Sequence, residues 1–214
     1  YIHDLGIRAV EFDVRQLKDH ELIIMHDDNM LRTTGIDQAL YPLSSTQLDS
    51  YNQAHIWLDW EKQSTPTLRQ ALQIMQDFEH LEVEVKAVQT QAEAERLIQH
   101  LTQQLRGFEH SAVITSFDLK ILQALQDQHS TFKRGLLIED DIQHLAIEQA
   151  LKYDCCQIGW MNQLATDDLL KATQQANLAI SVWTVNDIER AKHLRDCGID
   201  GLITDFPKMM LQHL

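Results

Sequence analysis

The stretch Gly6-Ile7-Arg8-Ala9-Val10-Glu11-Phe12-Asp13-Val14 decides the fold, because it places two acidic residues inside an apolar strand. Its apolar and β-branched residues predict a strand over Ala9–Val14. Side chains alternate along a strand, so Glu11 and Asp13 are expected to point inward while Phe12 points outward. Two carboxylates are costly to bury unless a cation neutralises them. The stretch therefore predicts a polar site within an otherwise apolar sheet.

The rest of the chain alternates between strand and helix patterns. Strands are predicted over Ala9–Val14, Leu22–Met25, Leu81–Val85, Ala112–Ser116, Gly135–Ile138, Cys155–Gly159, Ala179–Val185 and Gly201–Thr204. Between most of them, apolar residues recur every three or four positions, which predicts helices. Leu22–Met25 is the exception, since it follows the first strand after the short polar turn Lys18–Glu21. It is predicted to return as a hairpin.

Several helix boundaries can also be predicted from single residues. Pro66 is expected in the first turn of one helix. Asp118 is predicted to be the N-cap of a later helix. Another helix follows Asp187, and Gly198 is expected just beyond its end.

Repeated strand–helix alternation predicts an α/β fold with a parallel sheet and right-handed crossovers. Such a sheet can be open and doubly wound or closed into a barrel. The seven alternating units are one short of a (β/α)8 TIM barrel, which typically has ~250 residues. We interpret residues 1–214 as a single domain of this barrel type, lacking the first strand. Tyr1–Leu5 resembles the end of a helix with no strand before it.

Composition and charge exclude several classes of protein. No apolar run approaches the roughly 18 residues of a membrane-spanning helix. The formal net charge of −14 argues against nucleic acid as a partner and against stable binding to anionic membranes. A small anionic substrate is compatible with this charge if a bound cation reverses the local field. The cysteines Cys155, Cys156 and Cys197 lack CxxC spacing, and we expect reduced core thiols in the cytoplasm.

The candidate site is expected at the carboxyl ends of the strands, where barrel enzymes hold their catalytic residues. Glu11 and Asp13 of the first strand and Glu84 of the next parallel strand are predicted to converge there with His26 and Lys86. Ligation by oxygen atoms alone suits Mg²⁺ or Ca²⁺. A metal beside a lysine suits a phosphate group, and histidine exchanges protons near neutral pH.

Each of these residues also has an ordinary structural explanation. Glu11 and Asp13 could form an acidic rim of the sheet, and Glu84 with Lys86 could be a surface ion pair of little consequence. A lone histidine such as His26 is more often structural than catalytic. The gathering of all five at neighbouring strand ends favours a functional site.

The order of motifs along the chain resembles the glycerophosphodiester phosphodiesterase family over about residues 4–209. The matching segments are Glu11-Phe12-Asp13-Val14, Met25-His26-Asp27-Asp28 with Leu31-Arg32-Thr33-Thr34-Gly35, Thr65-Pro66-Thr67-Leu68, Glu84-Val85-Lys86, Ser116-Phe117-Asp118, Val182-Trp183-Thr184-Val185-Asn186 and Gly198-Ile199-Asp200-Gly201-Leu202-Ile203-Thr204-Asp205-Phe206-Pro207. Each motif is weak alone, but seven in order are specific.

The resemblance implies a role for each matching residue. It assigns Glu11, Asp13 and Glu84 as metal ligands, His26 as one of two catalytic histidines, Lys86 as a phosphate contact, Trp183 as an aromatic at the mouth of the site, and Phe117 as an apolar wall. The implied reaction is metal-dependent hydrolysis of glycerophosphodiesters to glycerol 3-phosphate and an alcohol, through a cyclic phosphate. The cofactor would be Mg²⁺ or Ca²⁺, and the partner a small-molecule glycerophosphodiester.

One departure from the family pattern affects activity. The family's opening His-Arg-Gly and Pro-Glu-Asn segments, which carry the other histidine, an arginine and a fourth acidic ligand, have no match in these 214 residues. We expect them to precede Tyr1, and we expect the 214 residues alone to be nearly inactive. His3 lies on the wrong side of the first strand to replace the missing histidine.

Two other functions remain open at this point. A related phosphodiesterase acting on phospholipids would need an exposed apolar rim, which the loop Tyr51–Trp60 could provide, although the acidic net charge of the chain favours a packed lid. A degenerate barrel that binds only a phosphate or a metal is the second. A helix-mediated scaffold is weaker, because it leaves the acids at the strand ends unexplained.

Overall fold

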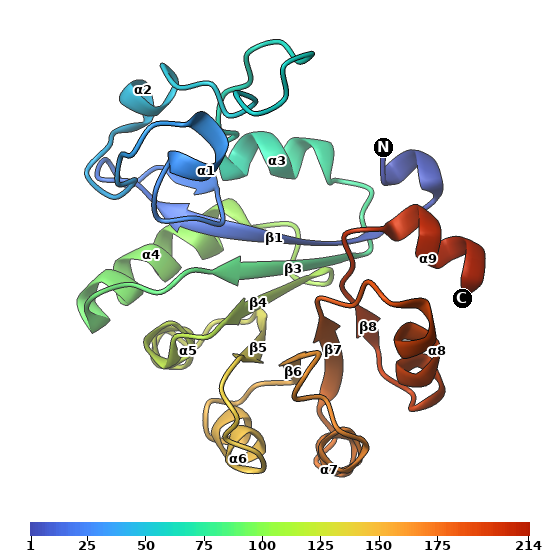
Figure 1. Ribbon diagram of the computed structural model, residues 1–214. Coiled ribbons are helices and arrows are strands. Elements are labelled where there is room, and N and C mark those ends of the chain that lie inside the picture. Colours follow the sequence, from blue (N-terminus) through green and yellow to red (C-terminus); the bar gives the residue numbers. More distant parts are fainter.

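The computed structural model describes residues 1–214 and contains one curled sheet of eight strands surrounded by helices (Figure 1). The strands are β1 (Ala9–Gln16), β2 (Leu22–Ile24), β3 (His80–Val85), β4 (Ala112–Ser116), β5 (Lys133–Ile138), β6 (Gln157–Met161), β7 (Ala179–Trp183) and β8 (Gly201–Leu202). Their order in the sheet is β2-β1-β3-β4-β5-β6-β7-β8. All pairings are parallel except that of β1 with β2.

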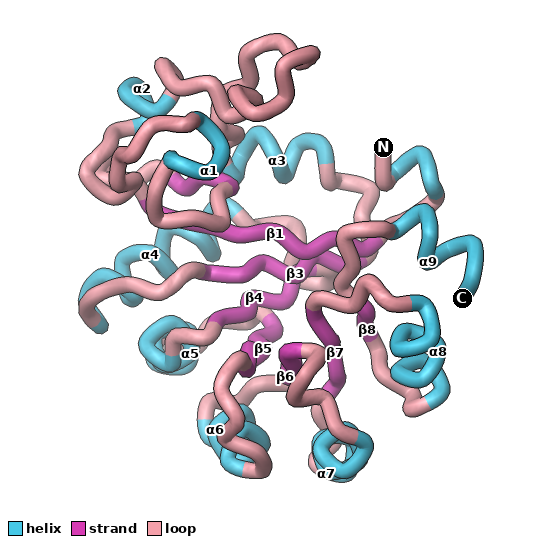
Figure 2. The backbone as a smooth tube through the Cα atoms, viewed as in Figure 1, coloured by secondary structure: helices cyan, strands magenta, loops and turns pink.

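The helices are η1 (His3–Leu5), α1 (Leu31–Thr34), α2 (Ser45–Leu48), α3 (Leu68–Ile74), α4 (Gln91–Gln104), α5 (Leu119–Asp127), α6 (Leu145–Lys152), α7 (Asp167–Gln175), α8 (Ile188–Asp196) and α9 (Pro207–His213). Helices α4 to α8 lie on the outer face of the sheet, while α1, α2 and the long loops gather around the β1–β2 hairpin (Figure 2). No helix is both long enough and apolar enough to cross a membrane.

The predicted α/β barrel-type fold is confirmed, with the sheet left open between its two edge strands, β8 and β2. All eight predicted strands are present, including the hairpin return of β2, and their ends shift by at most a few residues. The β6 strand begins at Gln157 rather than Cys155, because Asp154 turns with a positive φ of 54° just ahead of it. The sequence therefore predicted the element order and the open gap, but not every strand end.

Helix capping follows the predictions with one exception. The side chains of Asp118 and Asp187 each accept a hydrogen bond from the first turn of the helix they precede, and Gly198 lies beyond α8 with a positive φ of 76°. Pro66, however, is outside α3 rather than in its first turn. Thr67 is the N-cap instead, because it forms a capping box with Gln70.

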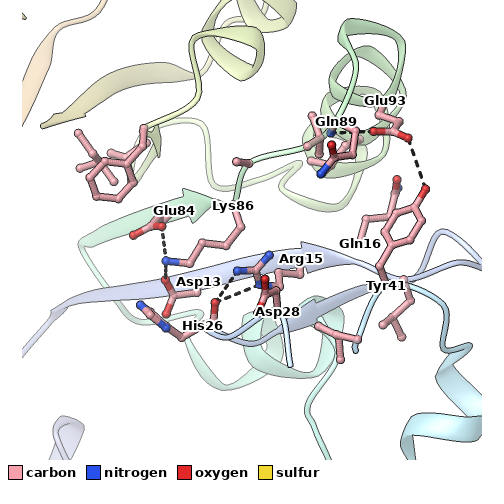
Figure 3. Close-up of a pocket in the computed structure, with 18 of the residues that line it drawn as sticks. Asp13, Arg15, Gln16, His26, Asp28, Tyr41, Glu84, Lys86, Gln89 and Glu93 are labelled. Carbon is pink, nitrogen blue, oxygen red and sulfur yellow. Dashed lines mark hydrogen bonds and ion pairs between the residues drawn. The ribbon is translucent and has the colours of Figure 1, made fainter. Parts of the chain in front are cut away.

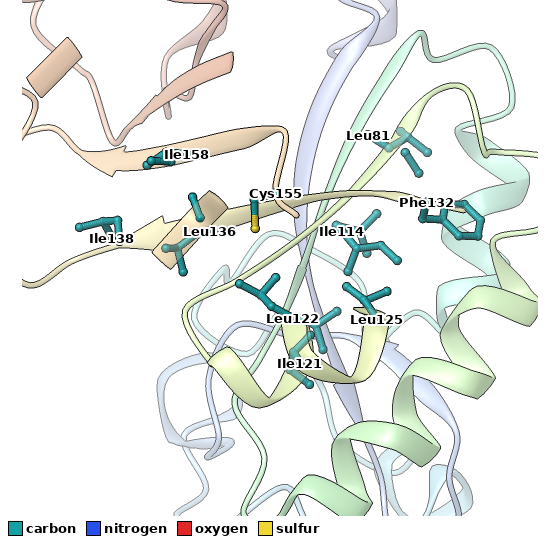
Figure 4. Close-up of a cluster of buried hydrophobic side chains, with 14 of the residues drawn as sticks. Leu81, Ile114, Ile121, Leu122, Leu125, Phe132, Leu136, Ile138, Cys155 and Ile158 are labelled. Atoms are coloured by element: carbon teal, nitrogen blue, oxygen red, sulfur yellow. The ribbon is translucent and has the colours of Figure 1, made fainter. Parts of the chain in front are cut away.

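The main core lies between the sheet and its helices and contains 41 buried side chains. Figure 4 shows part of it, where Leu122 and Leu125 of α5 pack beside Ile114 and Leu136 of the sheet. Phe12 belongs to this core, so it points outward as predicted. A second cluster of 7 buried residues lies around the β1–β2 hairpin and its following loops. It supports the segment that carries His26.

Two expectations about exposure are wrong. The tip of the loop Tyr51–Trp60 is no packed lid, since Leu58 is 95% exposed and Trp60 is 66% exposed. Backbone hydrogen bonds such as Gln53 N to Gln63 O close the base of the loop, and its apolar tip packs against no buried cluster. All three cysteines are free, but only Cys155 is a core thiol, while Cys156 is exposed and Cys197 half-buried.

A matched pair of leucine substitutions tests this distribution of packing. Leu122→Ala removes a fully buried side chain from α5 and should lower the free energy of unfolding by about 2–5 kcal/mol, because it leaves a cavity. Leu58→Ala, at the exposed loop tip, should change it by no more than about 0.5 kcal/mol. Urea denaturation measures both values. Equal losses for the two variants would contradict the assigned core.

Candidate functional site

The site is built on the pairing of β1 with β3. Their parallel register sets Glu11 opposite Glu82 and Asp13 opposite Glu84. Because side chains alternate, all four acids face the inside of the curled sheet while their neighbours pack outward. The inward acidic face predicted for β1 is thus extended by an inward acidic face on β3.

Glu11, Asp13 and Glu84 form a compact group of carboxylates. One oxygen atom from each lies within 4.8 Å of the other two. Oε1 of Glu11 is buried and has no hydrogen-bond partner. Burial, reinforced by the charges of Asp13 and Glu84, raises the pKa of Glu11 to about 8. A buried carboxylate oxygen with no donor beside it fits a divalent cation bound by oxygen ligands.

Lys86 places its amino group between Asp13 and Glu84 and is the positive charge that pairs with them. Its Nζ lies 2.6 Å from Oδ1 of Asp13 and also forms an ion pair with Glu84 (Figure 3). Burial lowers the pKa of Lys86, but its hydrogen bonds to both carboxylates outweigh burial and raise it. Burial raises the pKa of Glu84 despite the lysine. Lys86 is therefore charged, and it holds two of the three acids in place.

The β1–β2 hairpin brings His26 to the same place. Met25 N donates to Asp13 O at 3.0 Å, which continues the strand pairing up to the histidine. Arg15, the next inward residue of β1, donates from Nε and a terminal nitrogen to the His26 carbonyl at 3.0 and 2.8 Å (Figure 3). The backbone of His26 is therefore fixed from both sides, although its ring is exposed.

The ring of His26 is oriented by a chain of charged residues. Its Nδ1 lies 2.8 Å from Oδ1 of Asp27. Arg32 donates to both oxygens of Asp27, at 2.7 and 3.2 Å. The hydrogen bond from Arg32 lowers the pKa of Asp27, so this carboxylate only accepts hydrogen bonds. Nδ1 must then carry the proton, which leaves Nε2 of the neutral ring free to accept one.

Two aromatic residues form an apolar wall. Phe117, just after β4, and Trp183, at the end of β7, meet edge to face with ring centroids 5.4 Å apart. Trp183 Nε1 donates to Gly159 O at 3.1 Å, which fixes the indole. The wall leaves an uncharged surface beside the acids.

All seven residues predicted for the site line one cavity of about 890 Å³. They are Glu11, Asp13, His26, Glu84, Lys86, Phe117 and Trp183. Such a volume is in the range of small-molecule sites. His3 lies elsewhere, against Phe78 near the start of β3, as expected. The structure thus brings together every residue that the sequence placed in the site.

The sequence reasoning missed four residues that build this site. Arg15 lies two positions beyond Asp13, so strand alternation could have found it. Glu82 lies two positions before Glu84 and is buried, with Oε1 accepting from Gln157 at 2.6 Å. Asp27 and Arg32 belong to a recognised sequence motif, but no role was predicted for them. Only the fold shows that Asp27 contacts His26 and that Arg32 contacts Asp27.

Comparison with known proteins gives a consistent result. A sequence model of the glycerophosphoryl diester phosphodiesterase family matches residues 3–209. A glycerophosphodiester phosphodiesterase of Caldanaerobacter subterraneus subsp. tengcongensis is 23% identical over 212 residues, covering 97% of this chain and 86% of that protein.

Solved structures show the same fold. The structure of an Oleispira antarctica phosphodiesterase in complex with the product sn-glycerol-3-phosphate superposes with a TM-score of 0.86 at 21% identity, covering 98% of this chain and 86% of that one. A glycerophosphodiester phosphodiesterase from Thermotoga maritima gives a TM-score of 0.76 at 20% identity, with coverage of 98% and 87%.

The raised pKa of Glu11 predicts a pH dependence. A carboxyl whose pKa rises on folding stabilises the metal-free fold below its unfolded value near 4.5, and that contribution is lost as the pH rises through about 8. A cation competes with the proton for Glu11, so Mg²⁺ or Ca²⁺ should bind more tightly as the pH rises from about 6 to about 9. Calorimetric titration at several pH values measures this. Glu11→Gln, which cannot titrate, should bind more weakly and with a flatter pH dependence; unchanged binding in that variant would remove Glu11 from the site.

Proposed function

Because the chain belongs to the glycerophosphoryl diester phosphodiesterase family, we propose that it hydrolyses glycerophosphodiesters to glycerol 3-phosphate and an alcohol with a divalent cation, Mg²⁺ or Ca²⁺. One observation carries the proposal beyond family membership. The carboxylates of Glu11, Asp13 and Glu84 lie within 4.8 Å of one another inside a cavity that Lys86 and His26 also line.

The cation would be held by Glu11, Asp13 and Glu84. When bound, it supplies Lewis-acid stabilisation of the charge that develops on the phosphate oxygens. Without a cation, Lys86 pairs with Asp13 and Glu84, and Oε1 of Glu11 has no partner. A phosphate group between them and Lys86 could accept hydrogen bonds from the lysine, which has up to three to donate. Lys86 is therefore proposed to bind and orient the phosphate.

His26 is proposed to move a proton at Nε2. In the implied reaction the neighbouring glycerol hydroxyl attacks phosphorus, the alcohol leaves, and water opens the cyclic phosphate. Nε2 can accept the proton of an attacking hydroxyl because Asp27 holds the proton on Nδ1. His26 matches one of the family's two histidines. General acid–base catalysis contributes about 10²–10⁴-fold per group.

The cavity walls favour a small diester over an intact phospholipid. Phe117 and Trp183 offer an apolar wall large enough for glycerol or a short alcohol group. The exposed apolar tip of the loop Tyr51–Trp60, which could face a lipid surface, contributes nothing to the cavity lining. A substrate drawn from a membrane would need such residues at the mouth of the site. The small-molecule substrate therefore remains the proposal.

Removal of single site residues tests the assignment. Glu84→Gln and His26→Ala should each abolish most turnover, and His26→Ala should cost about 10²–10⁴-fold. Release of glycerol 3-phosphate from glycerophosphodiesters, with and without EDTA, measures the rate. Glu148→Gln and His110→Ala change the same residue types at exposed positions outside the cavity and should leave the rate unchanged. Wild-type rates in either site variant would show that the site is misplaced.

A binding measurement keeps this test decisive if the chain turns over slowly. Calorimetry with glycerol 3-phosphate in the presence of Mg²⁺ or Ca²⁺ should show binding that Glu84→Gln loses and His26→Ala retains. Metal-dependent binding without any turnover would favour the degenerate binding module over the enzyme. Absence of both would contradict the proposed function.

The orienting role of Asp27 gives a separate prediction. Asp27→Asn keeps the shape of the side chain but removes the charge that fixes the proton on Nδ1 of His26. We expect kcat to fall by about 10²-fold or more with little change in KM, because the ring remains but its proton is misplaced. The pH profile of kcat should shift as well. A larger change in KM than in kcat would indicate that Asp27 contacts the substrate instead.

A further inference from the structure

A second group of side chains that could hold a metal lies outside the cavity, at the start of α7 and the end of α8. These helices cover the outer face of the sheet near β7 (Figure 1). The group consists of Asp167, His193 and Cys197, and one ligand atom of each lies within 4.8 Å of the other two. None of the three lines the catalytic cavity. The group therefore needs an explanation of its own.

The three residues come from the facing ends of two neighbouring helices. His193 of α8 and Cys197, the C-cap of that helix, are four positions apart, so they lie one turn apart on the same side. Asp167 is the first residue of α7, directly after its N-cap Thr166. Two ligands four apart on one helix with a third from a neighbouring element is a common arrangement of protein metal sites.

The distances within the group are close to those of a tetrahedral site. Cys197 Sγ lies 3.6 Å from His193 Nε2 and 3.9 Å from Asp167 Oδ1. Bond lengths to Zn²⁺ of about 2.0–2.3 Å put tetrahedral ligand atoms roughly 3.3–3.6 Å apart. His193 Nε2 and Asp167 Oδ1 are closer, at 2.7 Å, because they share a hydrogen bond. Both side chains are largely exposed, so they can separate by the small distance that a metal requires.

The backbone on both sides of the group is anchored. Gln174 of α7 donates from Nε2 to the carbonyls of Cys197 and Gly198, at 2.9 and 3.0 Å. Arg190 of α8 donates to Asn162 and to the carbonyl of Ala165, the latter at 2.6 Å, just ahead of α7. These contacts hold α7 and α8 at a fixed separation. Such preorganisation is what a metal site needs from its supporting residues.

Charge also favours a cation at this position. Asp167 and a Cys197 thiolate supply two negative charges against the two positive charges of a divalent metal. His193 and Cys197 lie at the carboxyl end of α8, where the helix dipole favours positive charge. Arg190, the nearby cation on the same helix, forms no ion pair with the group and donates instead to Asn162 and to the carbonyl of Ala165.

We propose that Asp167, His193 and Cys197 form a second metal site, which binds Zn²⁺ or a similar transition metal with water as the fourth ligand. Binding releases the thiol proton of Cys197 to solvent and forms a metal–thiolate bond. The sulfur, nitrogen and oxygen donors suit Zn²⁺ or Co²⁺ and not Mg²⁺ or Ca²⁺. An ion pair between Asp167 and His193 alone does not explain why the thiol of Cys197 lies within 4 Å of both side chains.

Cobalt spectroscopy tests the site independently of catalysis. Co²⁺ is titrated into the full chain with excess Mg²⁺ present to occupy the carboxylate site. We expect a thiolate-to-cobalt charge-transfer band in the near ultraviolet and the ligand-field bands of four-coordinate cobalt. Cys197→Ser should lose the charge-transfer band. Cys156→Ser, which changes an exposed cysteine elsewhere, is the matched control and should keep it.

Two further variants and a chemical readout complete the test. His193→Gln and Asp167→Asn should each weaken Co²⁺ binding by about 10-fold or more. Loss of a residue that only supports a metal ligand already weakens metal binding by this much, so loss of a ligand should cost at least as much. Zn²⁺ should displace Co²⁺ and slow alkylation of Cys197 but not of Cys156. Absence of a charge-transfer band, a band that survives in Cys197→Ser, or equal protection of both thiols would each overturn the proposal.

Discussion

The pairing of β1 with β3 is the constraint on which the rest of the site depends. Its register puts Asp13 opposite Glu84 and Glu11 opposite Glu82, so four acids face a curled interior. Glu82 is satisfied by Gln157, and Lys86 contacts two of the others. Glu11 is left with a buried, unpartnered oxygen. A slip of one residue would turn every acid into the core and every core residue into the cavity. The same register therefore fixes both the fold and the chemistry.

The opposite face of the same strands shows why such a site can exist. Phe12, Val14, Val83 and Val85 point away from the acids into the core of 41 buried side chains. That apolar layer holds the strands rigidly while the inward layer remains polar and partly open. The His26 segment has its own support, because a second buried cluster lies around the hairpin that carries it. The acids are thus held by strands and His26 by a hairpin, and Arg15 joins the two.

The sequence was sufficient for those features that depend on periodicity along one element. Alternation in β1 predicted the facing of Glu11, Asp13 and Phe12, and the helix patterns predicted the order of elements. It was insufficient where residues meet only through the fold. The hydrogen bonds from Arg32 to Asp27 and between Asp27 and His26 depend on a turn that no local sequence pattern predicts. The hydrogen bond from Gln157 to Glu82 joins two strands whose residues are 75 positions apart. The prediction of a packed lid at Tyr51–Trp60 was wrong because the net charge of a chain does not determine whether one loop packs against another element.

The two proposed metal sites differ in the donor atoms that they offer. Inside the cavity every donor is a carboxylate oxygen. Lys86 pairs with two of these carboxylates, so a cation must compete with the lysine for them. Hard cations with high charge density and a preference for oxygen suit that site. On the outer face the donors are a thiol, an imidazole and one carboxylate, which a transition metal prefers. Divalent transition metals also bind carboxylates more tightly than Mg²⁺ does, so affinity alone would not protect the cavity. The proposed outer site, with its thiolate ligand, would bind such a metal more tightly and would leave the carboxylates free for a hard cation.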